Sequence, residues 1–261
     1  MPRFSANLGF LWPDRPLLDR IRAAAAAGFK AIELHWPYDT PAEDIRVACT
    51  REGLAVLGLN TPLGDTDNGE FGLGALPGRE EEFQAGLDLS LTYARAIGAN
   101  AVHAMAGVIP PEQRAICIDT LVANLAQAAR KADGLTLLLE PINLRDKPGY
   151  LYSRVSDAVT IIERVGAANI RLMFDVYHVG VSEGDITRKL AKHLPVIGHI
   201  QIAAVPSRAE PDEGEINYAA IFATLDAIGY GGWVGCEYRP RGDTDEGLAW
   251  LSRLGTSLRR E

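Results

Sequence analysis

The sequence is poor in cysteine and has no long uninterrupted apolar run. Its three cysteines, Cys49, Cys117 and Cys236, are odd in number and far apart in apolar surroundings. This pattern favours free buried thiols in a reducing cytoplasm over disulfides or a cysteine-based metal site. No stretch approaches the roughly 20 apolar residues that cross a bilayer, and the N-terminal region lacks the apolar core of a signal peptide. We therefore expect a cytoplasmic protein that has no membrane partner.

Positive charge is also in short supply. The 26 Lys and Arg residues are outnumbered by 34 Asp and Glu residues, which gives a formal net charge of −8. A protein of this charge repels phosphate backbones, so the composition disfavours nucleic acid as a partner. An anionic substrate would need local cations to overcome the overall field.

What the sequence does contain is a repeated alternation of short β-like runs and longer helical patterns. Eight such strand–helix units in about 250 residues are what a closed (β/α)₈ TIM barrel requires. No linker interrupts the pattern, so we predict a single α/β barrel domain over residues 1–261. An open doubly wound sheet is the alternative, but no G-x-G-x-x-G follows the first run. The runs lie at 4–10, 31–35, 55–60, 101–106, 136–140, 170–175, 196–202 and 233–237.

Helical patterns follow these runs. Thr40 is expected to cap the second helix, with Pro41 in its first turn. The Gly-rich connection 61–78 is long enough to predict a functional or mobile loop, and Trp12 and Trp36 follow strands at places that suit a pocket wall. Later helices are expected near 112–133, 156–166, 184–194, 218–228 and 245–258.

Four of the runs carry an oxygen-bearing side chain at or near their ends: Glu140, Asp175, Gln201 and Glu237. Equivalent positions at the C-terminal ends of barrel strands lie around one rim and face one mouth. A single acid at a strand end is more often a helix cap or a salt-bridge partner than a ligand. Four on successive strands favour a functional site.

These four side chains form an all-oxygen set. Three carboxylates brought together repel one another and raise one another's pKa values unless a cation lies among them. Carboxylate and amide oxygens suit Mg²⁺ first and Mn²⁺ as an alternative, and they argue against a Cys/His zinc site. We therefore predict a divalent metal cofactor.

Glu140 and Glu237 come from the fifth and eighth strands and could approach a small substrate from two sides. One could remove a proton from a carbon beside a carbonyl while the other returns it, and the metal would stabilise the enediolate charge. This is the chemistry of a ketose–aldose interconversion.

At these residues the sequence resembles the hydroxypyruvate isomerase family of the xylose isomerase-like TIM barrels, from residue 3 to about residue 250. His35 departs from the family pattern, which has an apolar aromatic residue at that place. The motifs that carry the resemblance are RFSANLGF, PYD, GREEEF, YARAIG, LLLEPIN, PGY, DVYH, GHIQIA, EINY and GWVGCEY.

The resemblance implies an intramolecular oxidoreductase of carbohydrate and glyoxylate metabolism. It would interconvert hydroxypyruvate and 2-hydroxy-3-oxopropanoate through an enediolate, with Glu140 and Glu237 as acid/base pair and with these two, Asp175 and Gln201 as metal ligands. A 2-oxo-tetronate isomerase, which acts on a four-carbon 2-oxo acid, or a ketose 3-epimerase is the alternative.

Similarity to related ketose epimerases implies that Asp146, His178 and Arg208 contact the substrate, with the last two on loops above the rim. An anionic 2-oxo acid needs a fixed cation; Arg208 suits this role, and Lys147 or Arg239 could serve instead. A homo-oligomer stays open, because the 61–78 connection could pack against a second subunit.

Two other classes of protein are less well supported. An endonuclease-type hydrolase would need a histidine-rich multi-metal cluster and a basic face, which five histidines and a charge of −8 disfavour. A non-catalytic barrel would tolerate Glu→Gln changes at positions 140 and 237.

Overall fold

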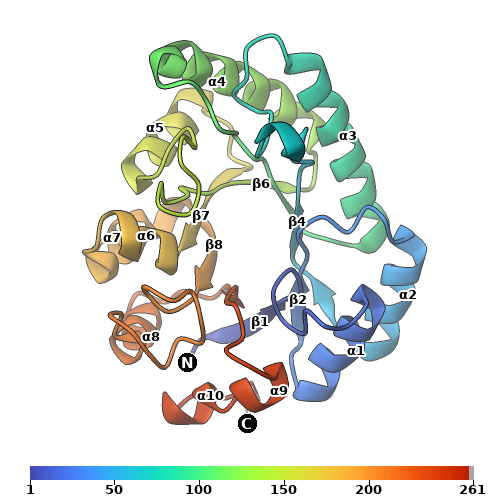
Figure 1. Ribbon diagram of the computed structural model, residues 1–261, viewed down its shortest axis with the longest axis vertical. Helices are drawn as coiled ribbons and strands as arrows, with labels where there is room; N and C mark the ends of the chain where they lie inside the picture. Colours follow the sequence, from blue (N-terminus) through green and yellow to red (C-terminus); the bar gives the residue numbers. More distant parts are fainter. Residues whose placement is uncertain (259–261) are drawn as a thin grey trace.

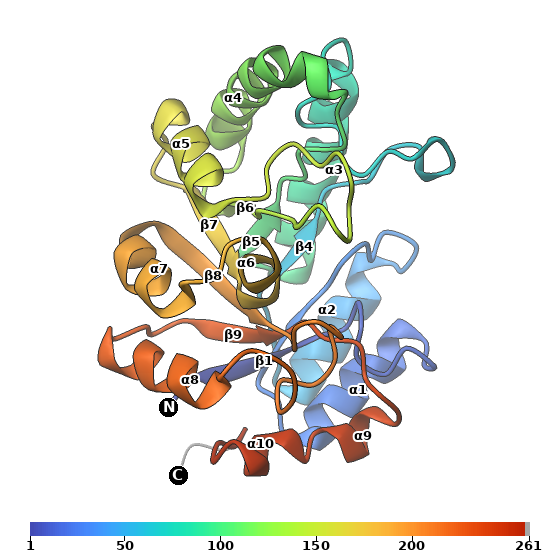
Figure 2. The ribbon, with the colours of Figure 1, turned by 60° about the vertical axis from the view of Figure 1, so that its left-hand side comes forward.

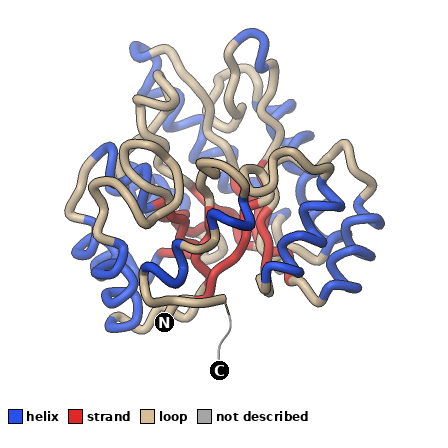
Figure 3. Tube along the Cα trace, turned by 60° about the horizontal axis from the view of Figure 1, so that its bottom comes forward, coloured by secondary structure: helices blue, strands red, loops and turns tan. Residues whose placement is uncertain are grey.

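Nine parallel strands of the computed structural model, which describes residues 1–258, form one sheet surrounded by helices (Figures 1 and 3). The strands are β1 (Arg3–Asn7), β2 (Ala31–Glu33), β3 (Ala55–Val56), β4 (Gly58–Asn60), β5 (Ala101–His103), β6 (Thr136–Leu139), β7 (Ile170–Asp175), β8 (Ile197–Ile202) and β9 (Trp233–Cys236). The helices are α1 (Leu17–Ala27), α2 (Ala42–Glu52), α3 (Glu80–Ile97), α4 (Arg114–Lys131), α5 (Val155–Val165), α6 (Val176–Ser182), α7 (Ile186–His193), α8 (Tyr218–Ala227), α9 (Thr244–Gly247) and α10 (Trp250–Arg253).

The sheet closes on itself at the third run. β3 pairs with β2 and β4 pairs with β5, and only Leu57 separates the two short strands. The Leu34 amide donates to the Gly58 carbonyl and the Asn60 amide to the His35 carbonyl, both at 2.9 Å, so β4 also contacts the β2 side. β3 and β4 are thus two halves of one barrel strand, and the predicted (β/α)₈ TIM barrel is confirmed.

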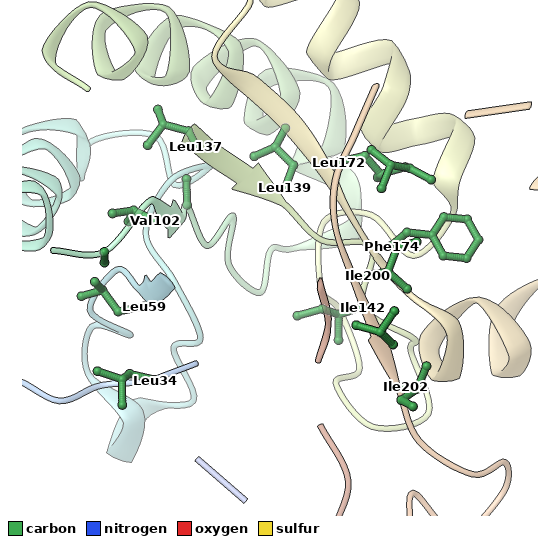
Figure 4. Packing of buried hydrophobic residues seen from close by; sticks show 14 of the residues in the cluster. Leu34, Leu59, Val102, Leu137, Leu139, Ile142, Leu172, Phe174, Ile200 and Ile202 are labelled. Carbon is green, nitrogen blue, oxygen red and sulfur yellow. The ribbon is translucent and has the colours of Figure 1, made fainter. Parts of the chain in front are cut away.

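Strand residues divide between two cores. Those that point outward pack under the helices, as Figure 4 shows for Leu137, Leu172 and Ile200, which are fully buried. Ala101, Leu138 and Met173 form a small separate cluster that lines the barrel interior. Each large aliphatic side chain buried in this way contributes about 1.5–3 kcal/mol to stability.

Several predicted elements need correction. Thr40 does not cap α2, because the helix begins at Ala42, which makes Pro41 the N-cap residue, and no side chain caps it. The helix expected at 245–258 is two four-residue helices, since α9 ends at Gly247, a poor helix former whose backbone lies against the Glu210 carboxylate. The predicted later helices correspond to α4, α5, α7 and α8.

Long connections gather at the C-terminal ends of the strands. The segment 61–78 leaves β4 and stands out from the barrel in Figure 2, while Gly72 bridges back to Ala106 and Val108 to Tyr150. The three cysteines are free and buried, as predicted. No helix within residues 1–258 is long and apolar enough to span a bilayer.

Candidate active site

A cavity of about 350 Å³ lies at the C-terminal mouth of the barrel. The residues that line it include five of the seven predicted site residues: Glu140, Asp146, His178, Arg208 and Glu237. The other two lie deeper, since Asp175 is buried and Gln201 lines a second cavity of about 190 Å³ inside the barrel. His35 and His103 are among the residues that line both cavities, which therefore adjoin.

Asp175 ends β7 and begins helix α6. Its Oδ1 accepts a hydrogen bond from the Tyr177 amide at 2.8 Å, which caps the helix. Within residues 1–258, Asp175 Oδ2 and Glu140 Oε1 have no hydrogen-bond partner although both are buried. Glu140, Asp175 and His178 each offer a ligand atom, and these atoms lie within 4.8 Å of one another. The two carboxylates of this corner could hold a metal ion.

His178 contributes to this corner mainly as a donor. Its Nδ1 accepts from the Asn143 backbone amide at 3.2 Å, so the proton of the neutral ring resides on Nε2. Nε2 lies 3.6 Å from Asp175 Oδ2 and 3.7 Å from Glu140 Oε1. Burial, together with the nearby Arg208, lowers the pKa of His178 to about 3 and keeps the ring neutral. The prediction placed His178 on a loop, whereas it lies in α6, which the sequence pattern did not reveal.

The carboxyl groups of this corner ionise with difficulty. Burial and then the charge of Glu237 raise the pKa of Asp175 to about 7. The same two causes, with Asp175 added, raise the pKa of Glu140 well above its usual range. A divalent cation would stabilise the charged forms of both groups.

The pKa of Glu237 is shifted in the opposite direction. Its Oε2 accepts from Asn7 Nδ2 at 2.8 Å and from Gln201 Nε2 at 2.6 Å, while its Oε1 accepts from Arg208 Nη2 at 2.8 Å. His35 Nε2 lies 3.5 Å from Oε2. Burial raises the pKa of Glu237, but His35 and Arg208 outweigh it and bring the pKa down to about 2.

Arg208 is held in place by its backbone. It adopts a φ of 57°, which is uncommon for a residue other than glycine and often marks a functional position. Its amide donates to the Ala204 carbonyl at 2.8 Å, and its carbonyl accepts from the Arg239 amide at 2.7 Å. The guanidinium then reaches Glu237 and lies 3.6 Å from Asp146 Oδ2. Asp146 also accepts from the Tyr177 hydroxyl at 2.6 Å.

Sequence reasoning missed a group of polar residues on the first strands and on β8. Asn7 and Glu33 end β1 and β2, and the strand-end rule that found Glu140 would have found them had it been applied to those strands. Glu33 is buried beside His199, whose Nε2 lies 3.1 Å from Glu33 Oε2. Burial lowers the pKa of His199, but Glu33 raises it further, so the net shift is upward.

His35 contacts the site because of a glycine. The ring of His35 lies directly over Gly9, where any Cβ would collide with it. Trp36, from the same segment, lines the cavity as predicted, and Phe71 brings the 61–78 connection to the cavity wall. Trp12 does not, because its fully buried indole packs away from the mouth and donates to Asp245 Oδ1 at 2.9 Å.

Three members of the predicted metal set present unpaired oxygens, whereas Glu237 is not among the residues whose ligand atoms lie within 4.8 Å of one another. Glu140 Oε1, Asp175 Oδ2 and Gln201 Oε1 are all buried oxygens that no donor of the described chain satisfies. Buried polar atoms are normally paired, so unpaired oxygens on three of the four predicted ligands point to a cation. Hard oxygen donors suit Mg²⁺ or Mn²⁺.

Comparison with known proteins places this site in a family. Residues 21–254 match the family model described as xylose isomerase-like TIM barrel. The chain is 48% identical to 2-oxo-tetronate isomerase of Cupriavidus necator, covering 96% of this chain and 98% of the relative. It is 39% identical to hydroxypyruvate isomerase of Escherichia coli, again over 96% of this chain and 98% of the relative.

A solved structure agrees closely with the fold. The crystal structure titled AP endonuclease, family 2, from Brucella melitensis superposes with a TM-score of 0.94 at 43% identity. The match covers 97% of this chain and 99% of that one.

Proposed function

This chain belongs to the xylose isomerase-like TIM barrel family and is an isomerase, and we propose that it moves a proton between C2 and C3 of a short 2-oxo acid. The single observation that carries this proposal is the pair Glu140 and Glu237, two buried carboxylates that line one cavity from barrel strands three apart. One removes the proton from one carbon, and the other supports its return to the neighbouring carbon.

The proton balance is simple. C3 of the 2-oxo acid loses its hydrogen to a glutamate, and the electron pair left behind forms the C2–C3 double bond of an enediolate. C2 then gains a proton from the other glutamate, and the hydroxyl proton of O3 ends on O2. Asp146, His178 and Arg208 line the cavity with a carboxylate, an Nε2–H donor and a guanidinium that hold these oxygens.

Glu140, Asp175, Gln201 and Glu237 would hold the divalent metal, Mg²⁺ or Mn²⁺. When bound, it supplies positive charge that stabilises the enediolate. The Arg208 guanidinium adds a second positive charge beside Glu237 and fixes the orientation of that carboxylate.

The substrate carboxylate needs a cation that is not already committed. Arg208 pairs with Glu237 and Asp146. Lys147 and Arg239 also line the cavity, and neither forms an ion pair with an acid of the described residues. Lys147 Nζ lies 3.9 Å from the centre of the Phe71 ring, which places a free ammonium at the cavity wall. We assign the substrate carboxylate to Lys147, with Arg239 as the alternative.

Two substrates share the required chemistry. Hydroxypyruvate and a 2-oxo-tetronate have the same reacting C2 and C3 and differ by one hydroxymethyl group on C3. The resemblance put the three-carbon acid first, whereas the Cupriavidus necator relative, named for the four-carbon acid, shares more residues with this chain. We therefore put the four-carbon acid first and hydroxypyruvate second.

The test is an isomerase assay with Mg²⁺ or Mn²⁺ in D₂O. Wild type should convert the four-carbon acid with the highest kcat/KM, and deuterium should enter the carbon that receives the proton. Glu140→Gln and Glu237→Gln should each lower kcat by about 10³-fold or more, within the range of general acid–base catalysis and metal loss combined. Glu81→Gln, an exposed acid on α3, is the matched control and should change nothing.

The outcomes separate the alternatives. Activity that survives both Gln substitutions would refute the two-carboxylate mechanism. Higher kcat/KM with free ketoses would point to a 3-epimerase, and cleavage of abasic DNA without isomerase activity would point to a hydrolase.

A further inference from the structure

Glu33 lines the interior cavity of the barrel and takes no part in the proposed proton transfer. It ends β2, is only 5% exposed, and contacts Gln201 and His199. Its Oε1 accepts from Ser5 Oγ at 2.5 Å, and its Oε2 accepts from Gln201 Nε2 at 2.8 Å. A carboxylate buried this deeply is costly unless it serves several partners.

Gln201 is bound on one side only. Its Nε2 donates to Glu33 Oε2 at 2.8 Å and to Glu237 Oε2 at 2.6 Å, so both of its N–H groups are used. Its Oε1 is buried and meets no donor from the part of the chain that the structure describes. A rotation of the amide by 180° would set this oxygen against two carboxylate oxygens, which repel it. The two carboxylates therefore dictate which atom of Gln201 is free to act as a ligand.

The barrel makes room for this arrangement at Gly235. This residue is the register partner of Gln201 on β9, and a Cβ built on it would collide with both carboxylate oxygens of Glu33. Any larger residue at position 235 would displace the Glu33 carboxylate. The absence of a side chain there lets Glu33 reach Gln201.

We propose that Glu33 is a positioning residue that orients the Gln201 amide, leaving Gln201 Oε1 as a metal ligand. Glu33 itself touches neither metal nor substrate. This inference rests on the metal site of the proposed function. The residue acts through Gln201, so its effect must disappear when Gln201 is removed.

Mn²⁺ binding to the metal-free protein, measured by isothermal titration calorimetry, provides the test. Glu33→Ala should weaken binding by about 10–100-fold, the usual effect of losing a partner behind a metal ligand. Glu33→Gln keeps an oxygen that can accept from Gln201 and should stay within about threefold of wild type. In a Gln201→Ala background, Glu33→Ala should add less than about threefold, whereas fully additive losses would show a merely structural role and overturn the proposal.

Two further variants guard against misfolding. Gly235→Ala changes no polar group, yet should weaken Mn²⁺ binding by displacing Glu33; if Glu33→Ala is too unstable to titrate, this variant and Glu33→Gln decide the matter. Gln84→Ala removes a buried amide that donates to the Asn124 carbonyl at 3.2 Å on α4, and should leave Mn²⁺ binding unchanged.

The role of Glu33 and the metal site itself can be tested separately. Wild-type binding of Mn²⁺ with an unchanged Kd in both Glu33→Ala and Gly235→Ala overturns the inference alone. If the wild type binds no Mn²⁺, the metal site of the proposed function falls and the inference falls with it.

Discussion

The two sides of the barrel mouth differ in how their carboxylates are satisfied. On the side of β6 and β7, which we call the open half, Glu140 and Asp175 each carry a buried oxygen that no donor within residues 1–258 reaches. On the side of β8, β9 and β1, the tied half, Glu237 accepts from Asn7, Gln201 and Arg208. The pKa shifts follow this division, upward for Asp175 and downward for Glu237.

This difference indicates a division of labour. An unpaired buried polar atom costs about 1–3 kcal/mol, so the oxygens of the open half favour binding of a cation. The tied half already has its donors, and these fix the orientation of the Glu237 carboxylate. Binding strength should therefore depend most on the open half, and turnover should depend on both.

Asp175→Asn should have the largest effect of any single change in the open half. Asparagine still caps α6, so the fold should hold, but the change removes a charged ligand from the open half. We expect Mn²⁺ affinity to fall at least about 100-fold and kcat/KM to fall about 10³-fold, because metal and charge stabilisation are lost together. Calorimetry and the isomerase assay measure both. Asp119→Asn, an exposed acid, is the control, and near-normal affinity in Asp175→Asn would contradict the division.

A change in the tied half should separate turnover from metal binding. Arg208→Gln removes the guanidinium that holds Glu237 Oε1. We expect kcat/KM to fall about 10–100-fold while Mn²⁺ binds at least as tightly as in wild type, because one competing positive charge is gone. Arg208→Lys should recover little, since an ammonium cannot replace the planar fork. Weaker Mn²⁺ binding in Arg208→Gln would show that Arg208 supports the metal site and would contradict a role in turnover alone.

The residues of the open half were accessible from the sequence. Glu140 and Asp175 end mostly apolar runs, and the barrel rule brings such positions to one rim. The tied half was only partly accessible: Gln201 and Glu237 follow the same rule, but which atoms pair with which depends on side-chain geometry across the barrel. The strand-end rule applies to Glu33 as well, but its hydrogen bond to Gln201 links residues far apart in sequence, and no local pattern reveals that bond.

Local capping explains two further differences. Asp175 both ends a strand and caps helix α6. No loop residues separate the two elements, so the sequence pattern did not predict the helix. The second helix lacks the expected Thr40 cap, and its start is set by Pro41 instead. The barrel closes because β3 pairs with β2 and β4 pairs with β5, on either side of Leu57. This pairing depends on the neighbouring strands and not on residues 55–60 alone.

Loss of the cation that we assign to the substrate carboxylate should have a smaller effect than the two changes above. Lys147→Met keeps the apolar stem against Phe71 but removes the ammonium. We expect KM for the 2-oxo acid to rise about tenfold with kcat nearly unchanged, because the lost contact is equal in ground and transition states. Arg239→Met is the matched comparison and should raise KM less. An unchanged KM in Lys147→Met would move the carboxylate site to Arg239 or Arg208.

The smallest effect on activity is expected from a change in the apolar cluster of the barrel interior. Leu138→Ala truncates one of the three apolar side chains that form the interior cluster. Stability should fall by about 2–4 kcal/mol, as for other large-to-small core changes, while kcat/KM stays within about twofold. Urea unfolding and the isomerase assay check the two values. A large loss of activity without a loss of stability would mean that the interior below the mouth takes part in catalysis.

We expect one divalent ion to bind between the open and tied halves, where anomalous scattering from crystals grown with Mn²⁺ can locate it. We predict one strong peak at about 2.0–2.6 Å from oxygens of Glu140, Asp175, Gln201 and Glu237, the range for hard oxygen ligands. A peak elsewhere, or none at saturating Mn²⁺, would contradict the account.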